Sequence, residues 1–120
     1  MATKSGSRAY VPDRGDLVAL TFDPQAGHEQ AGRRPAVVLS PAIYNGRSGL
    51  AVFAPVTNQI KGYPFEVLIP SGLPVTGAVL ADQLKSLDWR ARKAQHISKL
   101  PSHVLHEVLR KAAALVAPAG

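Results

Sequence analysis

The chain contains no cysteine among its 120 residues. Disulfide bonds and thiolate metal sites are therefore excluded, which fits a protein of a reducing cytosol. Long hydrophobic runs are also missing, because no apolar stretch approaches the roughly 18 residues that a membrane span requires. Residues 1–9 lack the apolar segment of a signal peptide. We therefore expect a soluble, cytoplasmic protein that does not contact a membrane.

Several motifs of known enzyme sites are missing as well. The chain has no phosphate-binding loop, no Gly-x-Gly-x-x-Gly and no His-Glu-x-x-His, so nucleoside-triphosphate and zinc-protease chemistry are without support. His103, His106 and Glu107 lie close together, but a solvated helix face explains them more simply, because a further type of ligand is missing. Acidic residues are too scattered for a two-metal nuclease site. We expect no metal ion and no cofactor.

Negative charge is scarce, since 8 Asp and Glu residues stand against 14 Lys and Arg residues and the net charge is +6 at pH 7. A basic surface favours an anionic partner such as nucleic acid or an acidic protein segment. A basic protein without such a partner is the alternative, because net charge determines association and not fold.

Apolar patterning predicts one domain over residues 10–117, preceded by a disordered tail at residues 1–9. Short apolar runs between Gly and Pro turns predict strands, and an amphipathic helix follows from Ser102, the expected N-cap. Pro55 indicates an edge or a bulge, which puts Thr57 at the rim of the sheet. These elements predict a mainly β fold, a small, partly open β-barrel or twisted antiparallel sheet with a C-terminal amphipathic helix. The predicted strands are Leu17–Phe22, Ala36–Ser40, Leu50–Thr57, Phe65–Ile69 and the long, bent Ala78–Asp88.

Residues 27–35, Gly-His-Glu-Gln-Ala-Gly-Arg-Arg-Pro, predict a polar, cationic loop that leads into a buried strand. Pro35 favours an extended conformation at Arg34, so the guanidinium leaves the loop beside Glu29 and the Gln30 amide. Cleavage of RNA by its own 2′-OH requires stabilisation of charge on a pentacoordinate phosphate, and an arginine fork suits that task. An ion pair with Glu29 that only holds the loop together is the alternative role for Arg34.

Four blocks of sequence carry a family resemblance. They are Tyr-Val-Pro-Asp-Arg-Gly-Asp-Leu at 10–17, Glu-Gln-Ala-Gly-Arg-Arg-Pro-Ala-Val-Val-Leu-Ser at 29–40, Pro-Val-Thr followed by Asn-Gln and Lys-Gly-Tyr-Pro-Phe-Glu-Val at 55–67, and residues 80–92. In this order the blocks resemble the MazF/PemK family of toxin endoribonucleases. The resemblance implies an SH3-like barrel that forms a homodimer and cuts single-stranded RNA at short sequences, without metal, to 2′,3′-cyclic phosphate and 5′-OH ends. It also implies the growth-inhibiting toxin of a bacterial toxin–antitoxin pair, silenced by an acidic, MazE-like antitoxin.

Matched position by position, Arg34 and Thr57 correspond to the family's catalytic arginine and threonine. Glu29 joins them as a candidate for proton transfer, because free arginine is a poor base with a pKa above about 12. Position 28 is often serine in the family, and His28 is a candidate proton carrier, a base-stacking group or a tolerated loop residue. Arg33 is a second arginine that could share the role of Arg34. The predicted RNA-binding residues, from the resemblance or from their polar character on loops and strand rims, are Arg14, His28, Gln30, Asn45, Lys61, Asp82, Gln83 and Lys85.

Two non-catalytic functions remain open for the same fold. A CcdB-type toxin binds and poisons DNA gyrase without cutting nucleic acid, although that group does not need the Arg-Pro block. A basic RNA-binding module without turnover would bind with a steep salt dependence and leave no new RNA ends. Readout of single-stranded RNA depends on loop shape, so the recognition sequence is a property of the tertiary structure.

Overall fold

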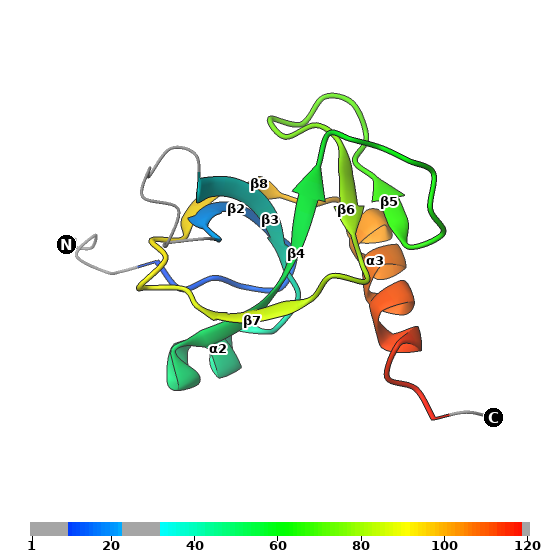
Figure 1. The fold of residues 1–120 in the computed structure, drawn as a ribbon. Coiled ribbons are helices and arrows are strands. Elements are labelled where there is room, and N and C mark those ends of the chain that lie inside the picture. Colours follow the sequence, from blue (N-terminus) through cyan, green and yellow to red (C-terminus); the bar gives the residue numbers. More distant parts are fainter. Residues whose placement is uncertain (1–9, 23–31, 119–120) are drawn as a thin grey trace.

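The computed structural model describes residues 10–22 and 32–118 of the chain. Its elements are β2 (Asp16–Thr21), β3 (Arg33–Val38), α2 (Ala42–Ser48), β4 (Leu50–Thr57), β5 (Glu66–Leu68), β6 (Ala78–Leu80), β7 (Lys85–Asp88), β8 (Gln95–Lys99) and α3 (Ser102–Ala114). The strands form one antiparallel sheet in the order β5-β6-β4-β3-β2-β8, and β7 also pairs with β4. Figure 1 shows α3 beside β5 and β6, at the opposite side of the molecule from the β2–β3 hairpin end. No helix in the described residues is long and apolar enough to cross a membrane.

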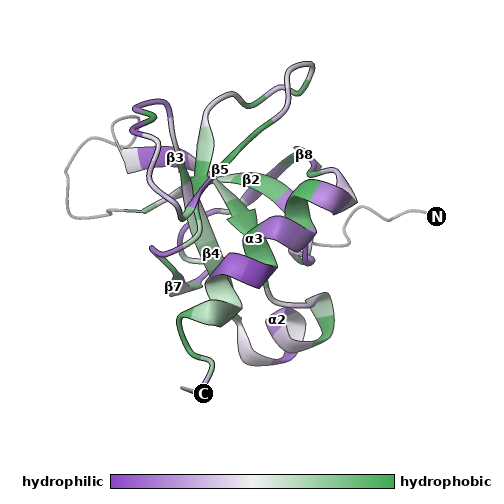
Figure 2. Ribbon diagram, turned by 90° about the vertical axis from the view of Figure 1, so that its right-hand side faces the viewer, coloured by the Kyte–Doolittle hydropathy of each residue, from purple (hydrophilic) through white to green (hydrophobic). Residues whose placement is uncertain are grey.

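The central strands β2, β3 and β4 bury side chains on both faces of the sheet. Leu17 and Val37 belong to an apolar cluster beneath α3, whereas Val18 and Phe53 belong to a second cluster that includes Trp89. Continuous apolar runs, rather than strict alternation, are the pattern of strands buried on both faces. In Figure 2 hydrophobic colouring runs through these strands, while α3 alternates between hydrophobic and hydrophilic stretches. The buried side chains of α3 are Val104, Val108 and Ala112.

The predicted fold class is confirmed, because the antiparallel sheet is open and a single amphipathic helix follows it. Among the described strands no pairing joins β5 to β8, the two ends of the strand order. The long strand predicted over 78–88 is interrupted as expected, since β6 and β7 are separated by a turn at 81–84. Both parts lie on the same edge of β4.

Pro55 lies where the pairing of β4 changes partners. On one edge of β4 it pairs with Ala36 of β3. On the other edge, the pairing of β4 with β7 stops at Phe53 and its pairing with β6 starts at Val56. An interrupted ladder tolerates a residue that has no N–H donor. β4 is therefore a central strand with one interrupted edge, and Thr57 is its last residue, at the rim of the sheet as predicted.

Three features differ from the sequence-based expectation. The strand predicted at Ala36–Ser40 is β3, Arg33–Val38, so the two arginines belong to the strand and not to the loop, because they pair with Thr21 and Leu20 of β2. β8 is absent from that prediction because its sequence, Gln-His-Ile-Ser-Lys, offers Ile97 as the one apolar residue. It forms as an edge strand through backbone pairing with β2, and Ile97 packs on the cluster beneath α3. The expected N-cap is wrong, because Pro101 is the N-cap of α3, Ser102 is its first helical residue, and no side chain caps the helix.

A buried carboxylate joins β2, β8 and the N-terminal segment. The Asp16 side chain is 5% exposed and accepts hydrogen bonds from the Tyr10 hydroxyl, the Asp13 backbone N–H and the Lys99 ammonium, whose Nζ lies 2.6 Å from Oδ1. Burial by itself would raise the pKa of Asp16, but the hydrogen bonds from Lys99, Tyr10 and Asp13 and the charge of Lys99 outweigh it and lower the pKa.

This lowered pKa predicts a loss of stability in acid. A carboxyl group whose pKa is lower in the folded than in the unfolded state stabilises the fold above its unfolded value, about 3.9, and this stabilisation is lost as the pH falls through the folded value. We expect the free energy of unfolding, from urea titrations between pH 7 and pH 3, to fall most steeply below pH 4. Asp16→Asn should lower the free energy of unfolding by about 1–3 kcal/mol at pH 7. It should also reduce the fall in this free energy below pH 4. Asp82→Asn removes an exposed carboxylate and should change neither the stability at pH 7 nor its fall below pH 4. An unchanged fall below pH 4 in Asp16→Asn would contradict this account.

Candidate active site

Arg34 and Thr57 lie on the neighbouring strands β3 and β4, near the end where the pairing of these strands stops. The antiparallel register runs from Val38 and Phe53 to Ala36 and Pro55, so Arg34 and Thr57 each lie two residues beyond the last pair. Arg34 lines the same cavity as Asn58, the residue that follows Thr57. The two residues of the predicted phosphate chemistry are therefore at the same end of the β3–β4 pair.

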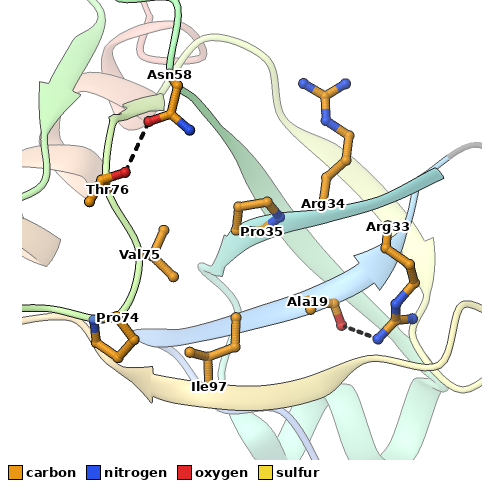
Figure 3. Close-up of a pocket in the computed structure, with 9 residues that line it drawn as sticks. All are labelled: Ala19, Arg33, Arg34, Pro35, Asn58, Pro74, Val75, Thr76 and Ile97. Atoms are coloured by element: carbon orange, nitrogen blue, oxygen red, sulfur yellow. Dashed lines mark hydrogen bonds between the residues drawn. The ribbon is translucent and has the colours of Figure 1, made fainter. Parts of the chain in front are cut away.

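The two adjacent arginines have different roles. The Arg33 guanidinium donates to the carbonyl oxygens of Ala19 (3.2 Å), Arg92 (3.2 Å) and Lys93 (2.9 Å), so it holds β2 against the turn before β8. Arg34 is exposed and makes no hydrogen bond or ion pair with any residue that the structure describes. Figure 3 shows the two side chains pointing to opposite sides of β3. Arg33 therefore stabilises the fold, whereas no described residue engages the exposed Arg34 guanidinium.

The Thr57 hydroxyl has a fixed oxygen and an available hydrogen. Its Oγ1 accepts a hydrogen bond from the Gln59 backbone N–H at 3.0 Å, which closes a short turn at the end of β4. A hydroxyl group donates one hydrogen bond, and no hydrogen bond within residues 10–22 and 32–118 uses this hydrogen. The hydroxyl can therefore donate to an anionic oxygen beside Arg34.

Hydrogen bonds join the described residues on either side of the segment 23–31. Phe22 N–H donates to the Gly32 carbonyl at 3.0 Å, and the Arg92 guanidinium donates to the carbonyl oxygens of Thr21 and Phe22. The first and last described residues around the segment 23–31 are thereby joined to each other and to the turn before β8. The predicted site residues His28, Glu29 and Gln30 lie outside the described residues.

Four further predicted RNA-binding residues lie on the segments that follow Thr57 or border β4. Lys61 is exposed four positions after Thr57, in a loop whose backbone N–H groups at Lys61 and Gly62 donate to the Glu66 carboxylate. The others are exposed on the turn between β6 and β7 or at the start of β7, and they are Asp82, Gln83 and Lys85. Their contact with RNA remains a prediction.

Two other predicted RNA-binding residues are not part of this surface. Arg14 precedes β2 and donates from Nε to the Leu39 carbonyl at 2.8 Å, so it lies at the opposite end of the β2–β3 hairpin from Arg34. Asn45 is fully buried, and its amide donates to the carbonyl oxygens of Pro12 and Ser40. The prediction that Asn45 binds RNA is therefore wrong, because its side chain joins α2 to the core and does not reach the surface.

Sequence reasoning missed the segment that closes the site next to Thr57. The Thr76 hydroxyl donates to the Asn58 side-chain carbonyl at 3.1 Å, and Gly77 has a φ of +119°. A Cβ atom at Gly77 would lie 2.2 Å from the Thr57 carbonyl oxygen, so the two backbones touch there. The one available signal was a glycine directly before a strand, which often marks a close backbone approach.

A cavity of about 300 Å³ opens between β3 and this segment (Figure 3). Its lining residues are Ala19, Arg33, Arg34, Pro35, Asn58, Pro74, Val75, Thr76 and Ile97. Within the described part of the chain, no group of three or more His, Asp or Glu side chains is arranged to hold a metal ion, and the expectation of a metal-free site stays a prediction.

Solved structures with this architecture are similar over nearly the whole chain. A MazF structure from Deinococcus radiodurans is 58% identical, with a TM-score of 0.82, and the match covers 90% of this chain and 98% of that one. A MazE–MazF complex from the same organism gives a TM-score of 0.84 at 55% identity, and the match covers 92% of this chain and 100% of that one.

Sequence comparison points to the same proteins. The endoribonuclease toxin MazF of Escherichia coli strain K12 is 59% identical over 85 residues, which are 71% of this chain and 76% of that protein. The endoribonuclease PemK of Escherichia coli is 36% identical over 101 residues, 81% of this chain and 76% of that protein. Residues 13–116 match the family described as PemK-like, MazF-like toxins of type II toxin–antitoxin systems. The chain belongs to this toxin family.

Proposed function

We propose that this endoribonuclease toxin cleaves single-stranded RNA at short sequences by attack of the 2′-OH on the adjacent phosphate. The reaction forms the bond from the 2′ oxygen to phosphorus and breaks the bond to the 5′ oxygen, which leaves with a proton. The products are a 2′,3′-cyclic phosphate and a 5′-OH, and no metal ion takes part. The observation that supports the proposal is that the exposed Arg34 guanidinium, which pairs with no described residue, lines one cavity with Asn58, the residue directly after Thr57.

Arg34 and Thr57 would act on the same group. The phosphorane gains negative charge on its non-bridging oxygens, and donors fixed before the reaction stabilise this charge more than they stabilise the ground state. Arg34 supplies a charged fork of donors, and the Thr57 hydroxyl supplies a neutral donor. Glu29 is our candidate for the proton acceptor, because arginine remains protonated.

The toxin domain in this proposal comprises residues 10–117 and acts in the bacterial cytoplasm. RNA binding beside the cut would draw on the net charge of +6 and on His28, Gln30, Lys61, Asp82, Gln83 and Lys85, and Arg14 would contact RNA only at a distance from the cut. Lys61 and Lys85 would contact phosphates, and the amide and carboxylate groups would contact base edges. The relatives named above are endoribonucleases, so they give no support to the alternative of a gyrase-binding toxin.

The test is cleavage of a long RNA of mixed sequence by the purified chain in the presence of EDTA, with the matching single-stranded DNA as control. We expect cuts in the RNA at a recurring short motif, with cyclic-phosphate ends, and an intact DNA strand. Cleavage that stops in EDTA would contradict the metal-free mechanism. Intact RNA together with inhibition of gyrase would establish the alternative.

We further infer a homodimer and an acidic antitoxin as partners. The complex of related MazE and MazF chains supports the second inference, and an acidic, partly disordered segment would complement the basic RNA surface. We expect sedimentation at micromolar concentration to give twice the chain mass. A monomer under those conditions would refute the dimer.

A further inference from the structure

The 300 Å³ cavity beside Arg34 has the character of a site for one planar, partly apolar group. Its floor is aliphatic and includes Pro35, Val75 and Ile97, and its polar rim carries Asn58, Thr76 and Arg34. Small-molecule sites occupy roughly 300–1,000 Å³, so the volume suits a single base rather than a longer segment. Sequence-specific readout of single-stranded RNA places unstacked bases against such surfaces and hydrogen-bonds their edges.

The Asn58 amide has a defined orientation at this rim. Its Oδ1 accepts the Thr76 hydroxyl hydrogen at 3.1 Å and faces Gly77, where a Cβ atom would lie 3.0 Å away. Figure 3 shows the amide nitrogen turned away from Thr76, toward the side of Pro35. The amide therefore offers N–H donors and not its carbonyl to a group in the cavity.

We propose that this cavity holds the base of the nucleotide next to the scissile phosphate, and that Asn58 is a specificity-determining residue that donates to an acceptor on that base. The inference rests on the proposed function, since it is the position of Arg34 at the rim that assigns the occupant to the nucleotide beside the cut. Thr76 is a positioning residue, because its hydroxyl holds the Asn58 amide in the donating orientation.

The experiment compares the cleavage motifs of the full-length wild-type and variant chains on one mixed-sequence RNA, by sequencing of all new ends. Asn58→Ala should lower the preference at a single position adjoining the cut by about fivefold to tenfold, the usual worth of one hydrogen bond, and leave the other positions unchanged. Asn58→Asp, which replaces donors by acceptors, should shift that position toward bases with a donor on the contacted edge. Thr76→Val should weaken the same preference and no other.

The matched control is Gln59→Glu, which adds the same charge at the neighbouring exposed residue outside the cavity. It should retain the wild-type motif even if added negative charge slows cleavage at every site. An unchanged motif in Asn58→Ala and Asn58→Asp would overturn this inference and leave the proposed nuclease intact. Absence of cuts by the wild-type chain would overturn both.

Discussion

Arg34→Ala is expected to reduce RNA cleavage by at least about 10²–10³-fold, the effect of removing one fixed donor from a charged transition state. The guanidinium is exposed and pairs with no described residue, so the free energy of unfolding should change by less than about 0.5 kcal/mol. Initial rates on a short RNA that contains the mapped motif, together with urea unfolding curves, measure the two effects separately. Arg34→Lys keeps the charge but loses the planar fork, and it should recover only part of the rate.

Arg110→Ala is the matched control for the charge. Arg110 is also exposed, with 72% of its side chain accessible, but it lies on α3 beside Glu107. Its removal takes away the same charge at a distance from β3 and should change the cleavage rate only slightly, mainly at low ionic strength. If Arg34→Ala cuts RNA as fast as Arg110→Ala, Arg34 is not a catalytic residue.

Gly77→Ala is expected to impair both stability and cleavage. The added Cβ would meet the Thr57 carbonyl oxygen at 2.2 Å and the Asn58 Oδ1 at 3.0 Å, so the backbone of Thr57 must move. Overpacking and a φ of +119° at a non-glycine residue should together lower the free energy of unfolding by at least about 2 kcal/mol. Because a displacement of about 1 Å can lower a rate by about 10²-fold, cleavage should fall strongly even at temperatures where the variant remains folded.

Gly72→Ala is the control that shows the effect of a positive φ without the contact that Gly77→Ala makes with Thr57. Gly72 also has a positive φ, +96°, but a Cβ atom there would meet nothing within 4 Å. The free energy of unfolding of this variant should fall by only about 1 kcal/mol, and its rate of RNA cleavage should equal that of the wild type. Equal losses of cleavage in the two variants would show that the approach of Gly77 to Thr57 does not control the site.

Local sequence determined most of the secondary structure. The apolar runs predicted β4 with both of its ends, the interruption between β6 and β7, and the helix that follows Pro101, because side-chain periodicity and turn residues act over a few neighbouring positions. Side-chain patterns did not predict β8. It has one apolar residue, and it forms through backbone hydrogen bonds to β2, a strand more than 70 positions earlier.

The sequence also determined the family of the chain, and through the Arg-Pro block and the threonine at the end of β4 it predicted the chemistry of the site. Only the tertiary structure decided which polar residues are available for it. Arg33 and Arg34 are equivalent in a sequence, yet carbonyl oxygens from β2 and from residues 92 and 93 engage the first and not the second. Asn45 was predicted from the sequence to be a polar, RNA-binding residue at the surface, but it is buried in the core. The partners that bury or engage a polar side chain come from distant parts of the chain, and their arrangement exists only once the sheet has assembled.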